Sequence, residues 1–161
     1  MRVFSIENDR IFYNALSKKM QLIYDVGCST GLRISDIVRM KKEILNIKEP
    51  TIKEQKTGKS RRIYFKKQIR NRLINFSSTS SNDYIFFSNS KSGHISRQAV
   101  WKAFKNAAQT AELKLNVGTQ SMRKKFAYTL KQKHNLKYVQ NKLNHDNILT
   151  SLIYCTNEKE L

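Results

Sequence analysis

Five side chains spread along the sequence are of types that act on phosphate groups. They are two arginines, a lysine, a histidine and a tyrosine: Arg33, Lys56, Arg123, His145 and Tyr154. Guanidinium groups stay charged at any working pH and bind phosphate oxygens through paired hydrogen bonds. A tyrosine hydroxyl, with an unperturbed pKa of about 10, attacks only where its proton is accepted or its anion is stabilised. Together these types suit the cleavage of a phosphodiester, provided that the fold brings them to one place.

The charge of the chain indicates a polyanionic partner. Its 161 residues include 31 Lys and Arg against 12 Asp and Glu, a formal net charge of +19. Nucleic acid is the commonest partner of such a protein, because each neutralised phosphate releases condensed counterions and adds salt-dependent affinity. An anionic membrane surface is the alternative, but no apolar run approaches the length of a spanning helix and the N-terminus lacks the pattern of a cleaved leader. We therefore expect a cytoplasmic protein that binds nucleic acid.

The cysteines and histidines indicate neither a disulfide framework nor a metal site. Cys28 and Cys155 lie far apart in no paired motif, and His94, His134 and His145 are scattered. We expect no metal and no other cofactor. Two of the histidines, His94 and His134, are predicted to be surface residues without a role, and Cys155 is predicted to be buried.

The elements that must position these side chains are mostly helical. Apolar residues at three- and four-residue steps predict a helix over residues 9–25, interrupted at residues 27–31, and then a new helix with Arg33 in its first turn. Short β-prone runs around a Lys-Thr-Gly-Lys turn predict a small antiparallel sheet within residues 45–65. Further helices are predicted at residues 66–76, after an N-cap at Ser96, and at residues 120–132, 136–143 and 148–155. The sequence predicts one α+β domain over residues 1–161, with Trp101 and Phe104 in its core.

Four segments, taken together, resemble the signature of the tyrosine recombinases, the phage integrase family. The first, Thr-Gly-Leu-Arg-Ile-Ser-Asp-Ile at residues 30–37, is similar to the first arginine box of the family and matches Arg33 with its phosphate-binding arginine. The second, Glu-Gln-Lys-Thr-Gly-Lys at residues 54–59, is similar to the hairpin segment in which a lysine just before the turn protonates the leaving oxygen. This match selects Lys56, and Lys59 is the competing assignment.

The third segment, Gly-Thr-Gln-Ser-Met-Arg at residues 118–123, resembles the His-x-x-Arg box of the family, and Arg123 is its matching arginine. Gln120 stands where the family usually has histidine. An amide keeps a hydrogen bond at that position but cannot transfer a proton at neutral pH.

The fourth segment, Leu-Asn-His-Asp-Asn at residues 143–147, resembles the Leu-Gly-His box of the family. Tyr154 follows His145 by nine residues, as the family pattern requires. Asn144 replaces the usual glycine and, like glycine, tolerates a left-handed backbone at the end of a helix.

The resemblance implies the catalytic-domain fold of a tyrosine recombinase and site-specific recombination or integration of DNA. In this family, the tyrosine attacks a DNA phosphate and forms a 3′-phosphotyrosyl intermediate, so that the strand can be rejoined. The implied catalytic residues are Arg33, Lys56, Gln120, Arg123, His145 and the nucleophile Tyr154. The implied partners are double-stranded DNA and other protomers on that DNA, with no membrane and no small-molecule substrate.

Two further expectations concern how complete the enzyme is. The catalytic motifs begin within about 30 residues of the start, so the N-terminal DNA-clamping domain of the family is expected to be absent. Because Gln120 replaces the usual histidine, the alternative function is a DNA-binding module that retains the recombinase fold but is catalytically impaired.

Overall fold

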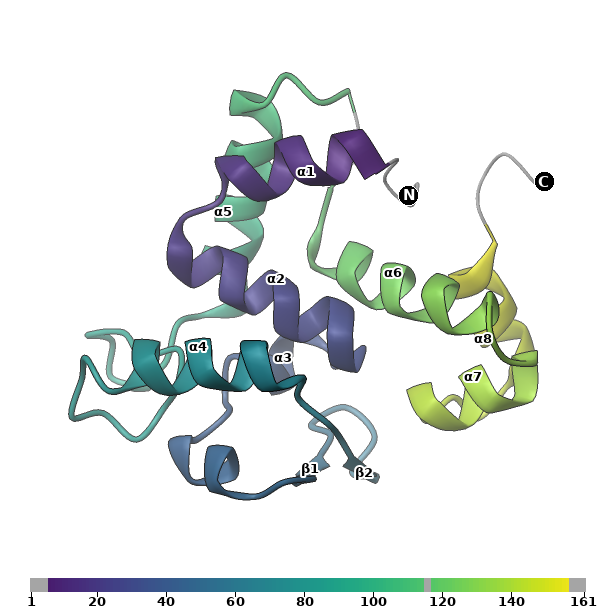
Figure 1. Ribbon diagram of the computed structural model, residues 1–161, viewed down its shortest axis with the longest axis horizontal. Coiled ribbons are helices and arrows are strands. Elements are labelled where there is room, and N and C mark those ends of the chain that lie inside the picture. Colours follow the sequence, from purple (N-terminus) through teal and green to yellow (C-terminus); the bar gives the residue numbers. More distant parts are fainter. Residues whose placement is uncertain (1–5, 115–116, 157–161) are drawn as a thin grey trace.

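Eight α-helices, one 3₁₀-helix and one two-stranded sheet form the part of the chain that the computed structural model describes, residues 6–114 and 117–156 (Figure 1). The predicted α+β fold, mostly helical with a small antiparallel sheet, is confirmed. Among the described residues, no helix is both long and apolar enough to cross a membrane. In chain order the elements are α1 (Ile6–Ala15), α2 (Lys18–Thr30), α3 (Ile34–Ile37), η1 (Lys42–Asn46), β1 (Thr51–Lys53), β2 (Ser60–Arg62), α4 (Lys67–Ser77), α5 (Arg97–Thr110), α6 (Thr119–Lys131), α7 (Leu136–Leu143) and α8 (Ile148–Cys155).

α1 and α2 replace the single helix that was predicted for residues 9–25, so that prediction was wrong at its centre. The chain breaks at Ser17, whose hydroxyl oxygen accepts a hydrogen bond from the amide of Met20 and caps α2. α2 then continues through most of the predicted interruption, with Gly27 inside it. A Cβ on Gly27 would overlap the side chain of Met122, so the glycine allows α2 and α6 to pack closely.

Arg33 lies directly before α3, and not in the first turn of a longer helix as predicted. The backbone turns at Gly31, which has φ +64°, and Arg33 itself is extended at the N-cap position. α3 is a single turn, although the apolar residues that predicted a longer helix are all buried. These buried residues are Leu32, Ile34, Ile37, Val38 and Met40.

The predicted sheet is the hairpin of β1 and β2, in which Thr51 is opposite Arg62. Its connection contains Gly58 in a left-handed conformation, with φ +66°, which lets the chain reverse within a few residues. Lys56 lies in this connection, so the hairpin places the lysine beyond the ends of the strands.

The helices that were predicted for the C-terminal third are confirmed within one residue of their predicted bounds. α6, α7 and α8 lie together at one side of the molecule, away from α1 and α4 (Figure 1). They enclose a small apolar cluster of Ala127, Val139, Leu143 and Cys155, so Cys155 is buried as predicted. This cluster is separate from the main core, and it fixes the three helices that carry three of the predicted site residues.

α5 begins after Ser96, whose hydroxyl accepts the amide hydrogen of Ala99, so the predicted N-cap is confirmed. Phe104 is fully buried, as predicted. Trp101 is 50% exposed, and its prediction as a core residue was wrong. The inward face of α5 is taken by Val100 and Phe104, one turn apart, and this spacing leaves Trp101 at the edge.

Candidate active site

Arg123 is the most deeply buried member of the predicted site, with 1% of its surface exposed. It comes from α6, and its guanidinium donates hydrogen bonds of 2.5 Å to the carbonyl oxygens of Gly31 and Leu143. These two carbonyls lie at the C-terminal ends of α2 and α7, where helices have unpaired acceptors. Arg123 therefore connects three helices as well as being a cation at the site.

The charge of Arg123 is held in unfavourable surroundings. Its pKa is lowered to about 10, mainly by burial, and the positive charges of the nearby Arg33 and Arg61 guanidinium groups act in the same direction. The group is nevertheless protonated at neutral pH. A buried cation next to other cations is suited to bind an anion. A bound phosphate would offset both the cost of burying the charge and the repulsion between the guanidinium groups.

His145 lies beside Arg123 at the turn between α7 and α8. Asn144 has φ +53° and ends α7 with a left-handed residue, as predicted. The Nε2 atom of His145 is 3.1 Å from a terminal nitrogen of Arg123, and its Nδ1 atom is 2.9 Å from the hydroxyl of Ser151. Because Arg123 only donates hydrogen bonds, Nε2 is the acceptor and the ring proton resides on Nδ1.

The imidazole of His145 is neutral at physiological pH. Burial lowers its pKa to about 4, and the positive charges of Arg123 and Arg33 act in the same direction. The turn that carries it is held by Gln140, whose side-chain amide donates to the carbonyl oxygens of His145 and Asp146. The structure thus fixes His145 as an uncharged, oriented ring.

Tyr154 projects from α8 toward Gln120 in the first turn of α6. Its hydroxyl donates a hydrogen bond of 3.1 Å to the side-chain carbonyl oxygen of Gln120. The ring centroids of Tyr154 and His145 are 5.1 Å apart, and the Arg123 guanidinium carbon is 5.9 Å from the Tyr154 ring. Four of the predicted site residues therefore meet at the contact between α6 and the α7–α8 corner.

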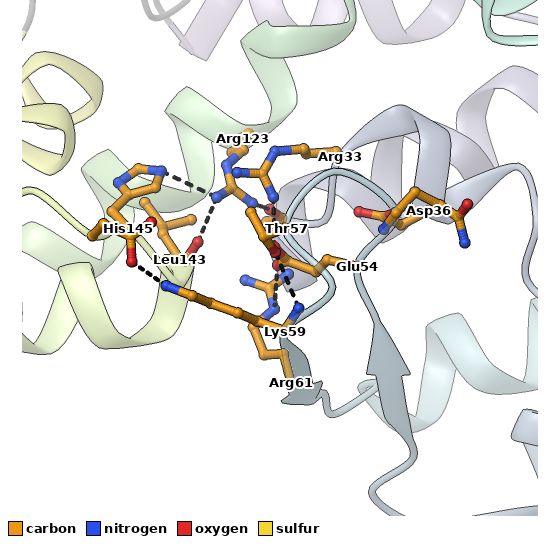
Figure 2. A network of polar contacts seen from close by, with 12 residues as sticks. Arg33, Asp36, Glu54, Thr57, Lys59, Arg61, Arg123, Leu143 and His145 are labelled. Atoms are coloured by element: carbon orange, nitrogen blue, oxygen red, sulfur yellow. Dashed lines mark hydrogen bonds and ion pairs between the residues drawn. The ribbon is translucent and has the colours of Figure 1, made fainter.

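Arg33 reaches the same region from the start of α3. It donates a 2.5 Å hydrogen bond to the carboxylate of Glu54, whose side chain is fully buried. Figure 2 shows Arg33 and Arg123 next to each other, above the hairpin that carries Glu54, Thr57 and Arg61. The electrostatic effect of Arg33 on both Arg123 and His145 agrees with this proximity.

The two candidate lysines of the hairpin have different surroundings. Lys56 is exposed and lines a groove of about 660 Å³, together with Arg33, Gln120 and the N-terminal end of α5. Lys59 instead forms an ion pair with Asp146, in the turn between α7 and α8. Lys56 is thus the one that shares a groove with two other predicted residues, and the groove is open to solvent.

Several residues of this region were not predicted from the sequence. Glu54 and Arg61 are buried in the hairpin, and Gln140 and Ser151 hold the turn and ring of His145. No local signal marks Glu54 and Arg61, because both stand in a run of charged residues that is typical of an exposed hairpin. His94, predicted to be a surface residue without a role, is half-buried and lines the same groove as Lys56.

Known proteins resemble this chain in sequence and in fold. The tyrosine recombinase XerD of Staphylococcus saprophyticus is 28% identical over 148 residues, which are 84% of this chain and 48% of that protein. The crystal structure of XerA recombinase matches with a TM-score of 0.81 at 20% identity, over 97% of this chain and 61% of the other. The structure of the lambda integrase catalytic core matches with a TM-score of 0.75 at 17% identity, over 90% of this chain and 92% of that core.

The chain therefore spans about half the length of the curated relative, and its fold is that of a tyrosine recombinase catalytic domain. The model of the phage integrase family matches residues 6–160, which is nearly the whole chain. On this match, the chain belongs to the phage integrase family.

Proposed function

We propose that this chain cleaves and rejoins DNA strands, with Tyr154 as the nucleophile and a 3′-phosphotyrosyl intermediate. The observation that carries the proposal is the position of Tyr154. Its hydroxyl is hydrogen-bonded to Gln120, and its ring lies near Arg123 and His145. Fixed cations at this position stabilise the charge that develops on a phosphate in the transition state.

In the proposed reaction, the Tyr154 oxygen forms a bond to phosphorus and the bond from phosphorus to the 5′-oxygen breaks. Lys56 donates a proton to the departing 5′-oxygen, and the phenol loses its own proton to water in the open groove, because an amide accepts a hydrogen bond but takes no proton. Arg33 and Arg123 bind the non-bridging oxygens. The reverse attack by a 5′-hydroxyl rejoins a strand without an external energy source.

His145 has a more restricted role in this proposal than the family resemblance implies. Its Nε2 accepts from Arg123 and its Nδ1 donates to Ser151, so neither nitrogen is available to donate to a phosphate in this arrangement. We therefore assign to His145 the orientation of Arg123. A hydrogen bond from His145 to phosphate requires that the contact with Arg123 first be released.

The groove that contains Lys56 supplies the proposed path for DNA. It continues over the start of α5, where Arg97 and Gln98 also line a second hollow, of about 300 Å³, with the half-exposed Trp101. Basic, amide and aromatic side chains are the types that contact DNA phosphates and base edges. A lambda integrase dimer bound to a core site shares this fold, with a TM-score of 0.83 at 16% identity, and so supports DNA as the partner.

The second candidate function is a DNA-binding module with impaired chemistry. Gln120 favours it, because an amide in the usual position of histidine cannot act as an acid or base at neutral pH. Both candidates predict DNA binding that weakens steeply with salt, given the net charge of +19. They differ in whether a covalent adduct forms.

A nicked DNA substrate that loses a short fragment upon cleavage traps the covalent intermediate and tests the proposal. The substrate is taken from a randomised pool selected for binding. We expect a denaturation-resistant adduct with the parent protein and with Tyr138→Phe, since Tyr138 is an exposed tyrosine of α7, and none with Tyr154→Phe. An adduct that appears only after Gln120→His identifies the impaired module, and an adduct that persists in Tyr154→Phe contradicts the assigned nucleophile.

A further inference from the structure

Glu54 is a fully buried carboxylate at the centre of the hairpin network, and the proposed reaction gives it no role. It lies directly after β1, and the exposed fraction of its side chain is 0%. One carboxylate oxygen accepts hydrogen bonds from Arg33 at 2.5 Å and from the Thr57 hydroxyl at 3.0 Å. The other oxygen is 3.5 Å from the Nε atom of Arg61. Figure 2 shows this carboxylate below Arg33 and next to Arg61.

The two arginines are not equivalent partners of Glu54. The contact with Arg33 is a short hydrogen bond, whereas among the described residues Nε and Nη2 of Arg61 and the facing Glu54 oxygen have no hydrogen bond at all. Arg61 uses its remaining terminal nitrogen to donate to the carbonyl oxygen of Lys142, next to the Leu143 carbonyl that Arg123 holds. Glu54 therefore orients the Arg33 guanidinium through a hydrogen bond. Arg61 makes no such bond, but its positive charge offsets the negative charge of Glu54.

The hydrogen bond to Glu54 leaves most of the N–H groups of the Arg33 guanidinium available to bind a phosphate. Only one nitrogen of Arg33 is bonded to Glu54, and among the described residues its other N–H groups have no protein acceptor. Arg33 also lines the groove of Lys56, where DNA is proposed to lie. A guanidinium that is fixed at one corner presents its free edge in one orientation, which increases the strength of a paired contact with phosphate.

We propose that Glu54 is a positioning residue that holds the Arg33 guanidinium in the orientation required to bind the DNA phosphate. The inference rests on the proposed function, because the phosphate is that of the cleaved DNA. It goes beyond that function in assigning a task to a residue that touches neither the phosphate nor Tyr154.

The exposed ion pair of Glu49 and Arg62 provides the matched control. It belongs to the same hairpin region, its atoms are 3.7 Å apart, and its side chains are 49% and 73% exposed. Glu49→Gln removes the same charge as Glu54→Gln, but from a solvated pair that contributes little. General effects of charge on DNA binding are therefore common to both variants, while the loss of the Arg33 contact is specific to Glu54→Gln.

The test is a double-mutant cycle on affinity for the selected DNA at low salt, measured for the parent, Arg33→Ala, Glu54→Gln and the double variant. We expect Arg33→Ala to weaken binding by about tenfold in the parent and in Glu49→Gln, but by less than about threefold once Glu54 is changed, because Arg33 is then misdirected. Glu54→Asp keeps the negative charge but moves the carboxylate away from Arg33, so it replaces Glu54→Gln in the cycle if that variant folds poorly. The effect of Arg33→Ala on affinity is expected to shrink in the same way. An equal effect of Arg33→Ala in all backgrounds overturns the proposal.

Cleavage provides a second readout that a purely structural role does not affect. A substrate with sulfur at the leaving 5′ position needs no general acid, because a thiolate leaves unprotonated. We expect Glu54→Gln to slow adduct formation equally on the oxygen and sulfur substrates, and full restoration by sulfur overturns the assignment to Arg33. If the parent binds DNA but forms no adduct, the proposed cleavage fails, while the affinity cycle still decides the role of Glu54.

Discussion

Tyr154 donates a hydrogen bond of 3.1 Å to the side-chain oxygen of Gln120, which connects the last described helix to the first turn of α6. Arg123 lies one turn further along α6, so the phenol and the buried guanidinium are positioned by the same helix. The amide of Gln120 accepts this hydrogen bond but, unlike an imidazole, it cannot exchange a proton at neutral pH.

Substitutions at Gln120 separate these two contributions. Gln120→Leu removes the acceptor of the Tyr154 hydroxyl, and we expect adduct formation to slow by about 3- to 10-fold, the value of one net hydrogen bond. Gln120→His restores a group that transfers protons near neutral pH and is expected to accelerate the step, within the range of about 10² to 10⁴ that such groups supply. Single-turnover rates on the nicked substrate measure both effects, and an unchanged rate in Gln120→Leu contradicts the role of this bond.

Arg123 is expected to stabilise the fold as well as the reaction. Arg123→Met leaves the buried carbonyls of Gly31 and Leu143 without their donor, and each unsatisfied group costs about 1–3 kcal/mol. We therefore expect urea unfolding to report a loss of about 2–5 kcal/mol. Arg62→Met, at an exposed arginine, is the control and should change stability by less than about 0.5 kcal/mol. Equal stability of the two variants contradicts the connecting role of Arg123.

The lowered pKa of His145 predicts a specific dependence of stability on pH. The folded protein keeps the ring neutral down to about pH 4, whereas the usual pKa of a histidine is 6.5. Between these values the unfolded chain binds more protons, so stability decreases as the pH falls from 6.5 toward 4. Urea unfolding at pH 7.5 and pH 5 should show a larger decrease for the parent than for His145→Gln, and equal decreases mean that the ring is not protected from protonation.

Two glycines with similar backbone angles are expected to differ in their tolerance of alanine. Gly31 and Gly58 have φ of +64° and +66°, so alanine is strained at either position by roughly 1 kcal/mol. A Cβ at Gly31 would also overlap the ring of Phe126, whereas nothing lies within 4 Å at Gly58. We expect Gly31→Ala to lower the free energy of unfolding, measured with heat or urea, by roughly 2–4 kcal/mol. Gly58→Ala should lower it only by the backbone strain of roughly 1 kcal/mol. Similar losses in both variants would show that α2 and α6 are packed less closely than described.

Local signals in the sequence predicted the C-terminal helices and the cap at Ser96, because these helices have an apolar face and a capping residue. The break between α1 and α2 was missed because Phe12, Leu16 and Met20 continue one helical spacing across it, and all three are buried. Ser17 was the available signal, as a capping residue within the apolar pattern. Gly27 shows the opposite case, since its place inside α2 depends on contact with α6 and not on local preference.

The residues that make up the site could be predicted only where a motif marks them. The nine-residue spacing of His145 and Tyr154 predicted that both belong to the site, and their ring centroids lie 5.1 Å apart in the structure. The burial of Glu54 and Arg61 could not be predicted, because whether a charged residue is solvated or enclosed is decided by the elements packed around it. The same reason explains the exposure of Trp101, which apolar character alone assigned to the core.

The most direct measurement is the chemical nature of the trapped adduct. After nuclease and protease digestion, mass spectrometry identifies the modified residue, and enzymatic labelling of the released strand reports whether its 5′ end is a hydroxyl. The account predicts a 3′-phosphate ester on Tyr154 and a free 5′-hydroxyl. A nucleotide attached to any other residue, or a 5′-phosphate bonded to tyrosine, would contradict the proposed reaction.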